Sequence, residues 1–397
     1  IVMEIFVLIF PMQWKYLYFC RMRPANRDAQ SIIENWLGKG KVIILTGARQ
    51  VGKTTLFRKI VENKRDVLWL NADESKVREK FQLLSTENLK RLVSGKKYVI
   101  IDEIQRIPDS GLLLKLLADN FKSTQVMATG SSALDIADKI YEPLTGRHFL
   151  FHLHPLMISE MYAGNSPFEI EQKLPFHLVY GCYPDIYNRP DDAEFLLKNL
   201  ATQYLYKDIL GWKEIRKPQL LEKLLQLLAY QIGSQVSVAE LGNQLKVKSE
   251  TVESYLDLLE KSFLIFRLPA FSNNPRKEVS KMNKIYFWDN GIRNSLIDDF
   301  DEISIRRDQG LLWENFVISE RRKWLAWNKP NVKTYFWRSY NQSEVDYIEK
   351  DKQKISAFEI KWSLKNKNVF SRAFTNSYPK ASTQVITPND IDDIFGM

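Results

Sequence analysis

The stretch Val42–Leu56, VIILTGARQVGKTTL, decides the fold of the first part of the chain. Its apolar start, Val42–Leu45, is expected to form a short buried strand. Gly47, four further residues and then Gly52-Lys53-Thr54 follow, which is the spacing of a phosphate-binding loop. A helix from Thr55 to about Val61 would point the positive end of its dipole at bound phosphates. Strand, loop and helix in this order predict a nucleoside triphosphate site.

Each part of this loop has an expected role. The glycines let backbone N–H groups curl around an anion, and Lys53 can reach the outer phosphates. The Thr54 hydroxyl is expected to hold Mg²⁺. A glycine-rich loop that arose by chance is the alternative, but it does not explain the strand and the helix on either side. The residues expected to bind the nucleotide are Gly47, Ala48, Arg49, Gln50, Val51, Gly52, Lys53, Thr54 and Thr55.

An acidic pair supplies the second half of the predicted site. Asp66–Leu70 and Lys97–Ile101 read as further buried strands, which favours a parallel α/β sheet with crossover helices. The later strand delivers Asp102-Glu103 at its carboxyl end. Asp102 would hold the Mg²⁺ shell, and Glu103 would orient or deprotonate the attacking water. Taken alone, the pair could equally be a solvated strand end.

Two further residues are candidates for contact with the triphosphate. Thr124–Thr129 is predicted to be a fourth strand, and Ser131 at its tip could touch both the γ-phosphate and the water. Arg147 follows in the segment LTGR. It could stabilise transition-state charge on a neighbouring subunit's nucleotide, which would require a homo-oligomer, or sense the nucleotide of its own subunit. It could also be an ordinary surface arginine.

The motifs GARQVGKTTL, IIDEIQRIP, ATGSSAL, LTGR and HPLMISEM occur in this order and resemble a broad bacterial and archaeal family of AAA-type ATPases. YGCYPDIYN, ATQYLYKDIL, KIYFWDNGIRN and LLWENFV extend the resemblance along the chain. It implies an α/β fold: a P-loop AAA-type parallel sheet with a helical lid, a winged helix and a small domain like restriction endonucleases. The expected divisions are an apolar extension at 1–22 outside the fold, the ATPase core at 23–150, the lid at 151–212, the winged helix at 213–290 and the endonuclease-like domain at 291–397.

The fourth of these divisions, residues 213–290, has the element order of a winged helix. Ser237 opens a helix with a capping box, Ser249 begins another, and FLIFRL at 263–268 reads as a strand. The wing tip would be Asn273–Lys281, which is rich in Arg and Lys. The helix starting SETVESY carries two glutamates, which face phosphates badly. DNA binding and protein docking therefore both stay open for this module.

The last third carries a second group of charged residues. Glu314 lies on the apolar face of a predicted helix, Gln309–Trp324. Among the predicted strands Lys333–Trp337, Glu344–Ile348 and Ala357–Trp362, Asp346 lies on the second, and Glu359 and Lys361 share one face of the third. Asp346 and Glu359, with Glu314 as a further ligand, would hold Mg²⁺, and Lys361 would position or activate water for phosphodiester cleavage. The alternative is an exposed strand pair of ordinary alternating polarity.

Composition limits the class of protein and its partners. The 397 residues, 45% hydrophobic and 12% aromatic, suggest two to four domains at about 100–200 residues each. A formal charge of +9 leans modestly toward an anionic partner such as nucleic acid. Cys20 and Cys182 stand alone, so neither a disulfide framework nor a zinc site is indicated, and a reducing cytoplasm fits.

The first twenty residues, IVMEIFVLIFPMQWKYLYFC, are very apolar. Glu4, Pro11 and Lys15 interrupt them well short of the roughly 20 apolar residues that a membrane span needs. A poorly ordered extension is expected, and no stable span. A membrane-associating anchor is the minor alternative.

The leading hypothesis is an ATPase that hydrolyses ATP with Mg²⁺ and couples hydrolysis to nucleic-acid contact. Whether the C-terminal domain also cuts DNA with a metal ion is left open. The competing hypothesis is an ATP-controlled switch or adaptor. In that case, the winged helix and the nuclease-like domain dock a protein partner without cleavage.

Overall fold

The computed structural model describes residues 25–82, 85–131, 144–203, 218–272, 283–339, 342–363, 370–391 and 394. The predicted extension 1–22 and the predicted wing tip 273–281 lie outside these residues. Within the described residues, no helix combines the length and the apolar character needed to cross a membrane.

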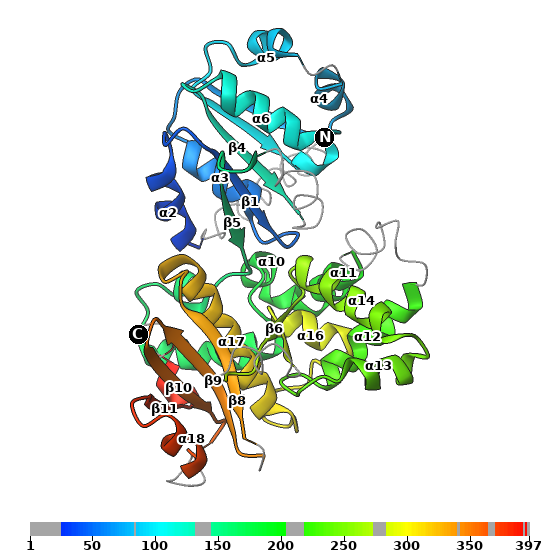
Figure 1. Cartoon of the computed structure of the whole chain (residues 1–397), viewed down its shortest axis with the longest axis vertical. Coiled ribbons are helices and arrows are strands. Elements are labelled where there is room, and N and C mark those ends of the chain that lie inside the picture. Colours follow the sequence, from blue (N-terminus) through cyan, green and yellow to red (C-terminus); the bar gives the residue numbers. More distant parts are fainter. Residues whose placement is uncertain are drawn as a thin grey trace, which may run out of the picture.

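The N-terminal unit is built on a five-stranded parallel sheet, which confirms the predicted α/β architecture. Its strands have the spatial order β2-β3-β4-β1-β5. β4 therefore lies between β1, which leads into the phosphate loop, and β3, which ends at Asp102. This sheet and its helices form one end of the molecule (Figure 1). The strands are β1 (Val42–Gly47), β2 (Val67–Asn71), β3 (Tyr98–Asp102), β4 (Gln125–Gly130) and β5 (His148–Leu153).

Helices cover both faces of this sheet because the strands are apolar on both sides. Ile43 and Leu45 of β1 belong to the same hydrophobic core as residues of α2 and α3, whereas Val42 and Ile44 belong to the core that includes α5 and α6. Alternate residues of β1 thus point into opposite layers. The helices are α2 (Asp28–Trp36), α3 (Lys53–Val61), α4 (Ser75–Lys80), α5 (Thr86–Val93) and α6 (Ser110–Asn120), with the 3₁₀ turn η1 (Ile104–Arg106) after β3.

The middle of the chain is mainly helical. The hairpin strands β6 and β7 pair antiparallel, and a bridge from Gln235 to Lys284 extends them. Helix α16 packs on α9, where Asn294 Nδ2 donates to Val179 O (2.8 Å), so the expected boundary at 290 separates α16 from elements that it contacts. The elements are α8 (Ile158–Met161), α9 (Pro167–Tyr180), α10 (Pro184–Asn188), α11 (Ala193–Gln203), α12 (Pro218–Tyr230), α13 (Val238–Leu245), α14 (Ser249–Lys261), β6 (Ile265–Leu268), β7 (Lys284–Phe287) and α16 (Asn290–Leu296).

A buried histidine in α9 makes the stability of this helical part sensitive to acid. Burial lowers the pKa of His177 to about 4, and its Nδ1 and Nε2 lie 2.8 Å from Gly181 O and 2.7 Å from Tyr162 OH. The carbonyl only accepts, so Nδ1 carries the proton and Nε2 accepts from the tyrosine. Below pH 6.5, the ordinary pKa of histidine, His177 takes up a proton in the unfolded chain but stays neutral in the folded chain. The stability that neutral His177 contributes is therefore fully present above pH 6.5 and is lost as the pH falls toward 4.

We expect His177 to account for about 2 kcal/mol of unfolding free energy lost between roughly pH 7.5 and pH 5. Carboxyl groups with raised pKa values change stability in the opposite direction, so the effect is isolated by comparing wild type with His177→Gln. Urea unfolding at the two pH values measures it. An identical pH dependence in both proteins would contradict the assignment.

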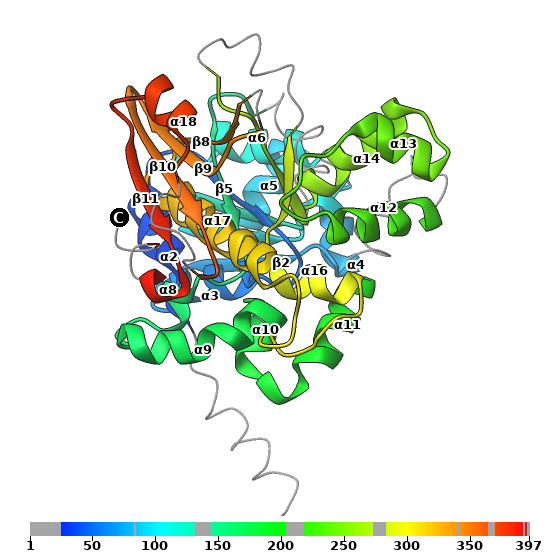
Figure 2. The ribbon, with the colours of Figure 1, turned by 90° about the horizontal axis from the view of Figure 1, so that it is seen from below.

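The C-terminal unit has a four-stranded sheet in the order β11-β10-β9-β8. β8, β9 and β10 correspond to the three predicted strands and pair antiparallel, and β11 adds a parallel edge strand that was not predicted. The sheet lies between α17 and α18, and α17 runs along one of its faces (Figure 2). The elements are α17 (Gln309–Asn328), β8 (Lys333–Arg338), β9 (Glu344–Asp351), β10 (Lys354–Ile360), α18 (Arg372–Ser377) and β11 (Ser382–Ile386).

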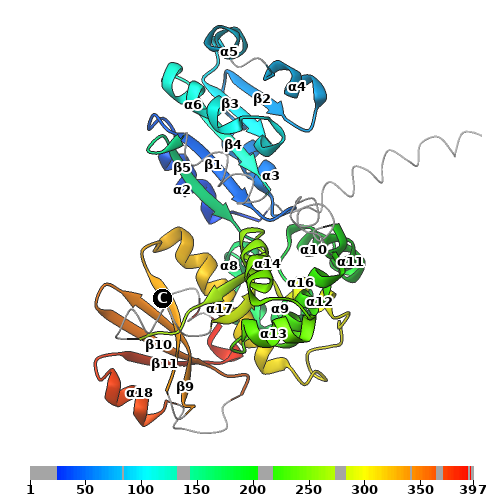
Figure 3. The same cartoon turned by 45° about the vertical axis from the view of Figure 1, so that its right-hand side comes forward.

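A buried ion pair joins α17 to the segment that follows β5. Glu320 Oε2 accepts from the backbone N–H of Ile158 (2.8 Å), and Glu320 Oε1 accepts from Lys323 Nζ (2.7 Å). Figure 3 shows β5 running from the N-terminal sheet to α8, close to α17. The long C-terminal helix is therefore bonded to the start of α8, a few residues after the last strand of the N-terminal sheet.

Candidate functional site

The phosphate loop begins where β1 passes very close to β5. A Cβ atom on Gly47 would lie 2.0 Å from Leu153 O, and the φ angle of Gly47 is 151°. Gly52, with a φ angle of 96°, turns the chain into α3. Only glycine fits the first position without moving the neighbouring strand, and the second needs a conformation that other residues adopt at a cost.

Lys53 is folded inward over the loop that precedes it. Its side chain is buried, and Nζ donates to Gly47 O (2.8 Å) and Ala48 O (2.7 Å). Both acceptors are neutral carbonyls at the start of the loop. An ammonium in this position suits an incoming anion, because phosphate oxygens form stronger, charge-assisted bonds with it.

Asp102 is held by two hydroxyl groups on neighbouring elements. Thr54 Oγ1 donates to both carboxylate oxygens (3.0 Å each), and Thr129 Oγ1 at the end of β4 donates to Oδ1. The side chain of Asp102 is buried. One carboxylate beside the hydroxyl of a Lys-Thr pair is the oxygen-rich surrounding that Mg²⁺ prefers, so these residues fit the ion.

Gln105 joins the two predicted residues Glu103 and Ser131. Its Nε2 donates to Glu103 Oε2 (2.5 Å) and to Ser131 Oγ (3.0 Å). Glu103 has a φ angle of 56°, and its N–H donates to Thr129 Oγ1 (3.1 Å). Sequence reasoning missed Gln105 and Thr129, although both lie within the quoted motifs IIDEIQRIP and ATGSSAL.

The structure places Arg147 away from the phosphate loop of its own subunit. Its carbonyl accepts from Val42 N (3.0 Å) at the start of β1, whereas the loop begins at the other end of that strand. Its half-exposed guanidinium pairs with Asp119 (2.7 Å). The predicted sensing of the same subunit's nucleotide is therefore wrong, because parallel strands put their two ends on opposite edges. A contact with a neighbour's nucleotide stays a prediction.

Arg27 reaches the loop from before α2, which no sequence motif signalled. Its Nη2 donates to Val51 O, and its Nη1 pairs with Glu160 Oε2 (2.9 Å). The same Glu160 oxygen accepts from Met157 N (2.9 Å) at the start of α8. The loop is thereby linked to the segment that contacts α17.

In the C-terminal unit, the structure brings Asp346, Glu359 and Lys361 together. Lys361 Nζ lies 2.8 Å from Asp346 Oδ2 and 2.7 Å from Glu359 Oε2, and Ile360 N donates to Asp346 Oδ2 (2.9 Å). Burial, followed by the charge of Asp346, raises the pKa of Glu359 to about 8. A proton on Glu359 therefore relieves the repulsion between the two carboxylates at neutral pH.

Glu314 does not complete the predicted metal site. Its Oε1 accepts from Tyr286 OH (2.6 Å) and from Lys284 Nζ (3.2 Å), and Lys284 also pairs with Glu344. No group of three or more acidic, His or Cys side chains placed to hold a metal ion occurs in the part of the chain that the structure describes. Ammonium groups contact the carboxylates of Glu314, Asp346 and Glu359, and the predicted ligand set of these three residues stays a prediction.

Residues 39–162 match a family model described as an AAA domain. The N-terminal unit is therefore similar to P-loop domains of the AAA type. Two models described as domains of unknown function, DUF8612 and DUF4143, match residues 171–302 and 309–393. The first of these covers α16 together with the helices on which it packs.

Several relatives share most of this chain. Uncharacterised proteins of Mycobacterium bovis and Mycobacterium tuberculosis are each 28% identical over 344 residues, covering 85% of this chain and 74% of the relative. An uncharacterised protein of Methanocaldococcus jannaschii is 27% identical, covering 66% of this chain and 63% of the relative.

Solved structures resemble the chain only distantly. A signal transduction ATPase with numerous domains and a tetratricopeptide repeat sensor, from Pyrococcus horikoshii, gives a TM-score of 0.30 at 15% identity, covering 77% of this chain and 46% of that chain. Drosophila ORC bound to AT-rich DNA and Cdc6 gives a TM-score of 0.25 at 10% identity, covering 72% of this chain and 95% of that chain. The AAA assignment therefore rests on the family match and on the geometry of the loop.

Proposed function

We propose that the chain hydrolyses ATP with Mg²⁺ at the phosphate loop and uses the hydrolysis to control its C-terminal domain. One observation carries the proposal: Asp102 bonds the loop hydroxyl of Thr54, and the adjacent Glu103 is joined through Gln105 to Ser131. A binding half and a hydrolytic half of a nucleotide site thus lie side by side. The match of this unit to an AAA domain supports the same activity.

The side chains of this site would divide the chemistry between them. Lys53 and the loop N–H groups would bind the phosphates, and Thr54 and Asp102 would hold Mg²⁺, which neutralises phosphate charge when bound. Glu103 would orient the attacking water and accept its proton. Gln105 would fix the Glu103 carboxylate, and Ser131 would contact the γ-phosphate. Arg147 would act on a neighbouring subunit's nucleotide in a homo-oligomer.

Phosphodiester cleavage by the C-terminal unit is a second candidate function. The observation that favours it is that Asp346, Glu359 and Lys361 converge within hydrogen-bond distance, although they come from two strands and the residue after the second. In this proposal, Asp346 and Glu359 would hold Mg²⁺, which would supply charge stabilisation when bound, and Lys361 would position or activate the water. The winged-helix order α12, α13, α14, β6, β7 would supply nucleic-acid contact.

Helix α14 instead favours the adaptor hypothesis. Arg267 pairs with Glu253, Asp257 and Glu260 on one face of this helix. A face that carries several acids repels a phosphate backbone and suits a basic protein surface. If this face is the contact surface, the module docks a protein partner and the C-terminal unit cuts nothing.

One experiment separates these functions. Purified protein is assayed for ATP turnover with and without DNA or RNA, and the same samples are run on a gel for nicking. The nuclease proposal predicts Mg²⁺-dependent nicking that Asp346→Asn lowers by at least ~10-fold, whereas the matched variant Asp351→Asn, exposed on the same strand, leaves it unchanged. Nicking that survives Asp346→Asn would remove the assigned site. ATP turnover without nicking and without any response to DNA or RNA supports the adaptor.

A further inference from the structure

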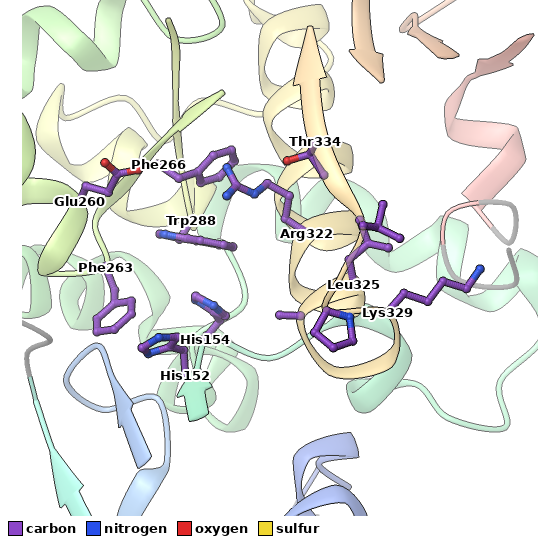
Figure 4. Close-up of a pocket in the computed structure, with 13 residues that line it drawn as sticks. His152, His154, Glu260, Phe263, Phe266, Trp288, Arg322, Leu325, Lys329 and Thr334 are labelled. Carbon is purple, nitrogen blue, oxygen red and sulfur yellow. The ribbon is translucent and has the colours of Figure 1, made fainter. Parts of the chain in front are cut away.

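A cavity of about 320 Å³ lies where the end of β5, the β6–β7 hairpin, α17 and β8 meet (Figure 4). It is separate from both sites described above. In the close-up, the indole of Trp288 after β7 lies between His154 and the guanidinium of Arg322 from α17. Lys329 and Pro330, which are exposed, lie at its mouth. The volume is within the range of cavities that hold small molecules.

One wall of the cavity is aromatic. The His154 ring stacks on Trp288 with centroids 3.8 Å apart and planes at 22°, and Phe266 packs against the same indole at 4.6 Å. Phe263 continues this wall beside the histidine, with centroids 5.9 Å apart. An aromatic wall of this kind can contact a planar ring in edge-to-face or offset arrangements.

The same cavity carries the positive charge of Arg322, which makes no direct contact with a carboxylate among the described residues. The Arg322 guanidinium lies 4.3 Å from the Phe266 ring centroid and 5.4 Å from that of Trp288, and its Nη1 donates to Arg267 O (3.2 Å). Glu260 also lines the cavity, but its carboxylate is engaged by Arg267 Nε (2.8 Å). No ion pair within the described residues uses Arg322. A half-buried guanidinium that no carboxylate contacts attracts an anion.

A buried polar atom in the cavity also lacks a partner within the described structure. His154 is 6% exposed, and its Nδ1 makes no hydrogen bond. Burial, followed by nearby positive groups, holds the pKa of His154 well below its usual range, so the ring is neutral at physiological pH. A neutral imidazole nitrogen can donate or accept one hydrogen bond. An unsatisfied buried group of this kind calls for an explanation, and a ligand supplies one.

We propose that this cavity is a second ligand site, which binds a small planar anion: an aromatic or heteroaromatic ring that carries a phosphate or a carboxylate. The ring contacts Trp288 and Phe263, the anionic group pairs with Arg322, and His154 Nδ1 makes one polar contact. Lys329 adds positive charge at the mouth.

The position of this site suggests that its occupant modulates the ATPase. His152, which also lines the cavity, shares a 2.6 Å hydrogen bond between its Nδ1 and Thr46 Oγ1. Thr46 directly precedes Gly47, the first residue of the phosphate loop. This regulatory part rests on the proposed ATP hydrolysis, whereas binding itself does not.

Calorimetry with four probes separates the contributions of ring and charge. Naphthyl phosphate and naphthoate each carry an aromatic ring and a negative charge. Naphthol carries only the ring, and inorganic phosphate carries only the charge. We expect wild-type protein to bind naphthyl phosphate or naphthoate at least ~10-fold more tightly than either single-feature probe. The comparison between the first two probes tells a phosphate ligand from a carboxylate ligand.

Variants then place the bound probe in the cavity. Arg322→Gln and Trp288→Leu are expected to weaken binding by at least ~10-fold, and Trp288→Phe by less because it keeps a ring. Lys329→Gln at the exposed mouth, which leaves the core intact, is expected to weaken it by roughly 2- to 5-fold. The control Lys64→Gln removes a cation that lies over Tyr98 in the ATPase unit, and binding is expected to be unchanged. Thermal unfolding identifies any variant that fails to fold.

The phosphate loop must be excluded as the place of binding. Lys53→Ala is expected to retain the probe, because the cavity does not include that residue. Loss of binding in Lys53→Ala alone would assign the probe to the phosphate loop and overturn the proposal. No binding of either charged ring, or equal binding in wild type and the folded Arg322 and Lys329 variants, would also overturn it. A probe that binds through Arg322 without changing ATP turnover supports the site and removes only its regulatory role.

Discussion

Replacing Glu103 with glutamine is expected to lower ATP turnover by at least ~100-fold while ATP binding stays nearly unchanged. The Glu103 carboxylate is held by Gln105 Nε2, and its backbone N–H is held by Thr129, so the side chain is positioned before nucleotide arrives. Glutamine keeps the shape of glutamate but cannot accept a proton from water. Steady-state phosphate release measures turnover, and calorimetry measures binding.

The matched control for this variant is Glu87→Gln. Glu87 is a surface glutamate of α5 that pairs with Arg91 at 2.8 Å, with 74% of its side chain exposed. We expect its turnover to equal that of wild type. If Glu103→Gln retained full turnover, the assignment of Glu103 as the proton acceptor would be wrong, and Gln105 and Ser131 would lose their proposed roles with it.

Replacing Glu320 with alanine is expected to lower the free energy of unfolding by about 3–5 kcal/mol. The Glu320 side chain is 0% exposed and its partner Lys323 is 2% exposed, so the variant leaves an uncompensated ammonium in the interior. It also removes the acceptor for Ile158 N at the start of α8. Urea unfolding, followed by circular dichroism, measures the change.

Two comparisons test the physical reason for this loss. Glu194→Ala breaks an exposed ion pair with Lys198 and is expected to cost only about 0–1 kcal/mol. The double variant Glu320→Met with Lys323→Met replaces both charges with apolar groups and is expected to recover part of the stability, because Ile158 N still lacks its acceptor. Equal losses in the Glu320 and Glu194 variants would show that the buried pair does not hold α17 to α8.

Local sequence patterns predicted the phosphate loop and the strands around it because their chemistry is contiguous. Gly47 to Thr54 fixes the loop, and the apolar run ending in Asp102-Glu103 fixes β3. Alternation along β9 and β10 placed Asp346 near Glu359 and Lys361 in the same way, since side chains repeat every second residue along a strand. In each case, the information lies within a few residues.

Contacts between distant residues could not be predicted from such patterns. Arg27 reaches Val51 and Glu160, and nothing near Arg27 in the sequence signals either partner. Glu314 was expected to be a metal ligand because a carboxylate on an apolar helix face needs a partner. The partners are Tyr286 and Lys284, which come from a separate hairpin. The need for a partner was therefore predicted, but its identity was not.

The contacts that cross the expected boundary at 290 could not be predicted for a similar reason. Asp289 caps α16 through Ile292 N (3.1 Å) and also accepts from Cys182 N (2.7 Å), which lies after α9. α16 therefore packs with the preceding helices, although it directly follows the hairpin strand β7. The position of Arg147 could not be predicted either, because its distance from the phosphate loop depends on the direction of the strands rather than on the sequence spacing.

The most direct test of the central claim compares wild type with Lys53→Ala for Mg²⁺-dependent ATP binding and turnover. Lys53 Nζ lies over the loop carbonyls of Gly47 and Ala48, where the outer phosphates would bind. The account predicts that wild type releases phosphate from ATP and that Lys53→Ala loses both binding and turnover. Turnover in Lys53→Ala equal to that of wild type would contradict it.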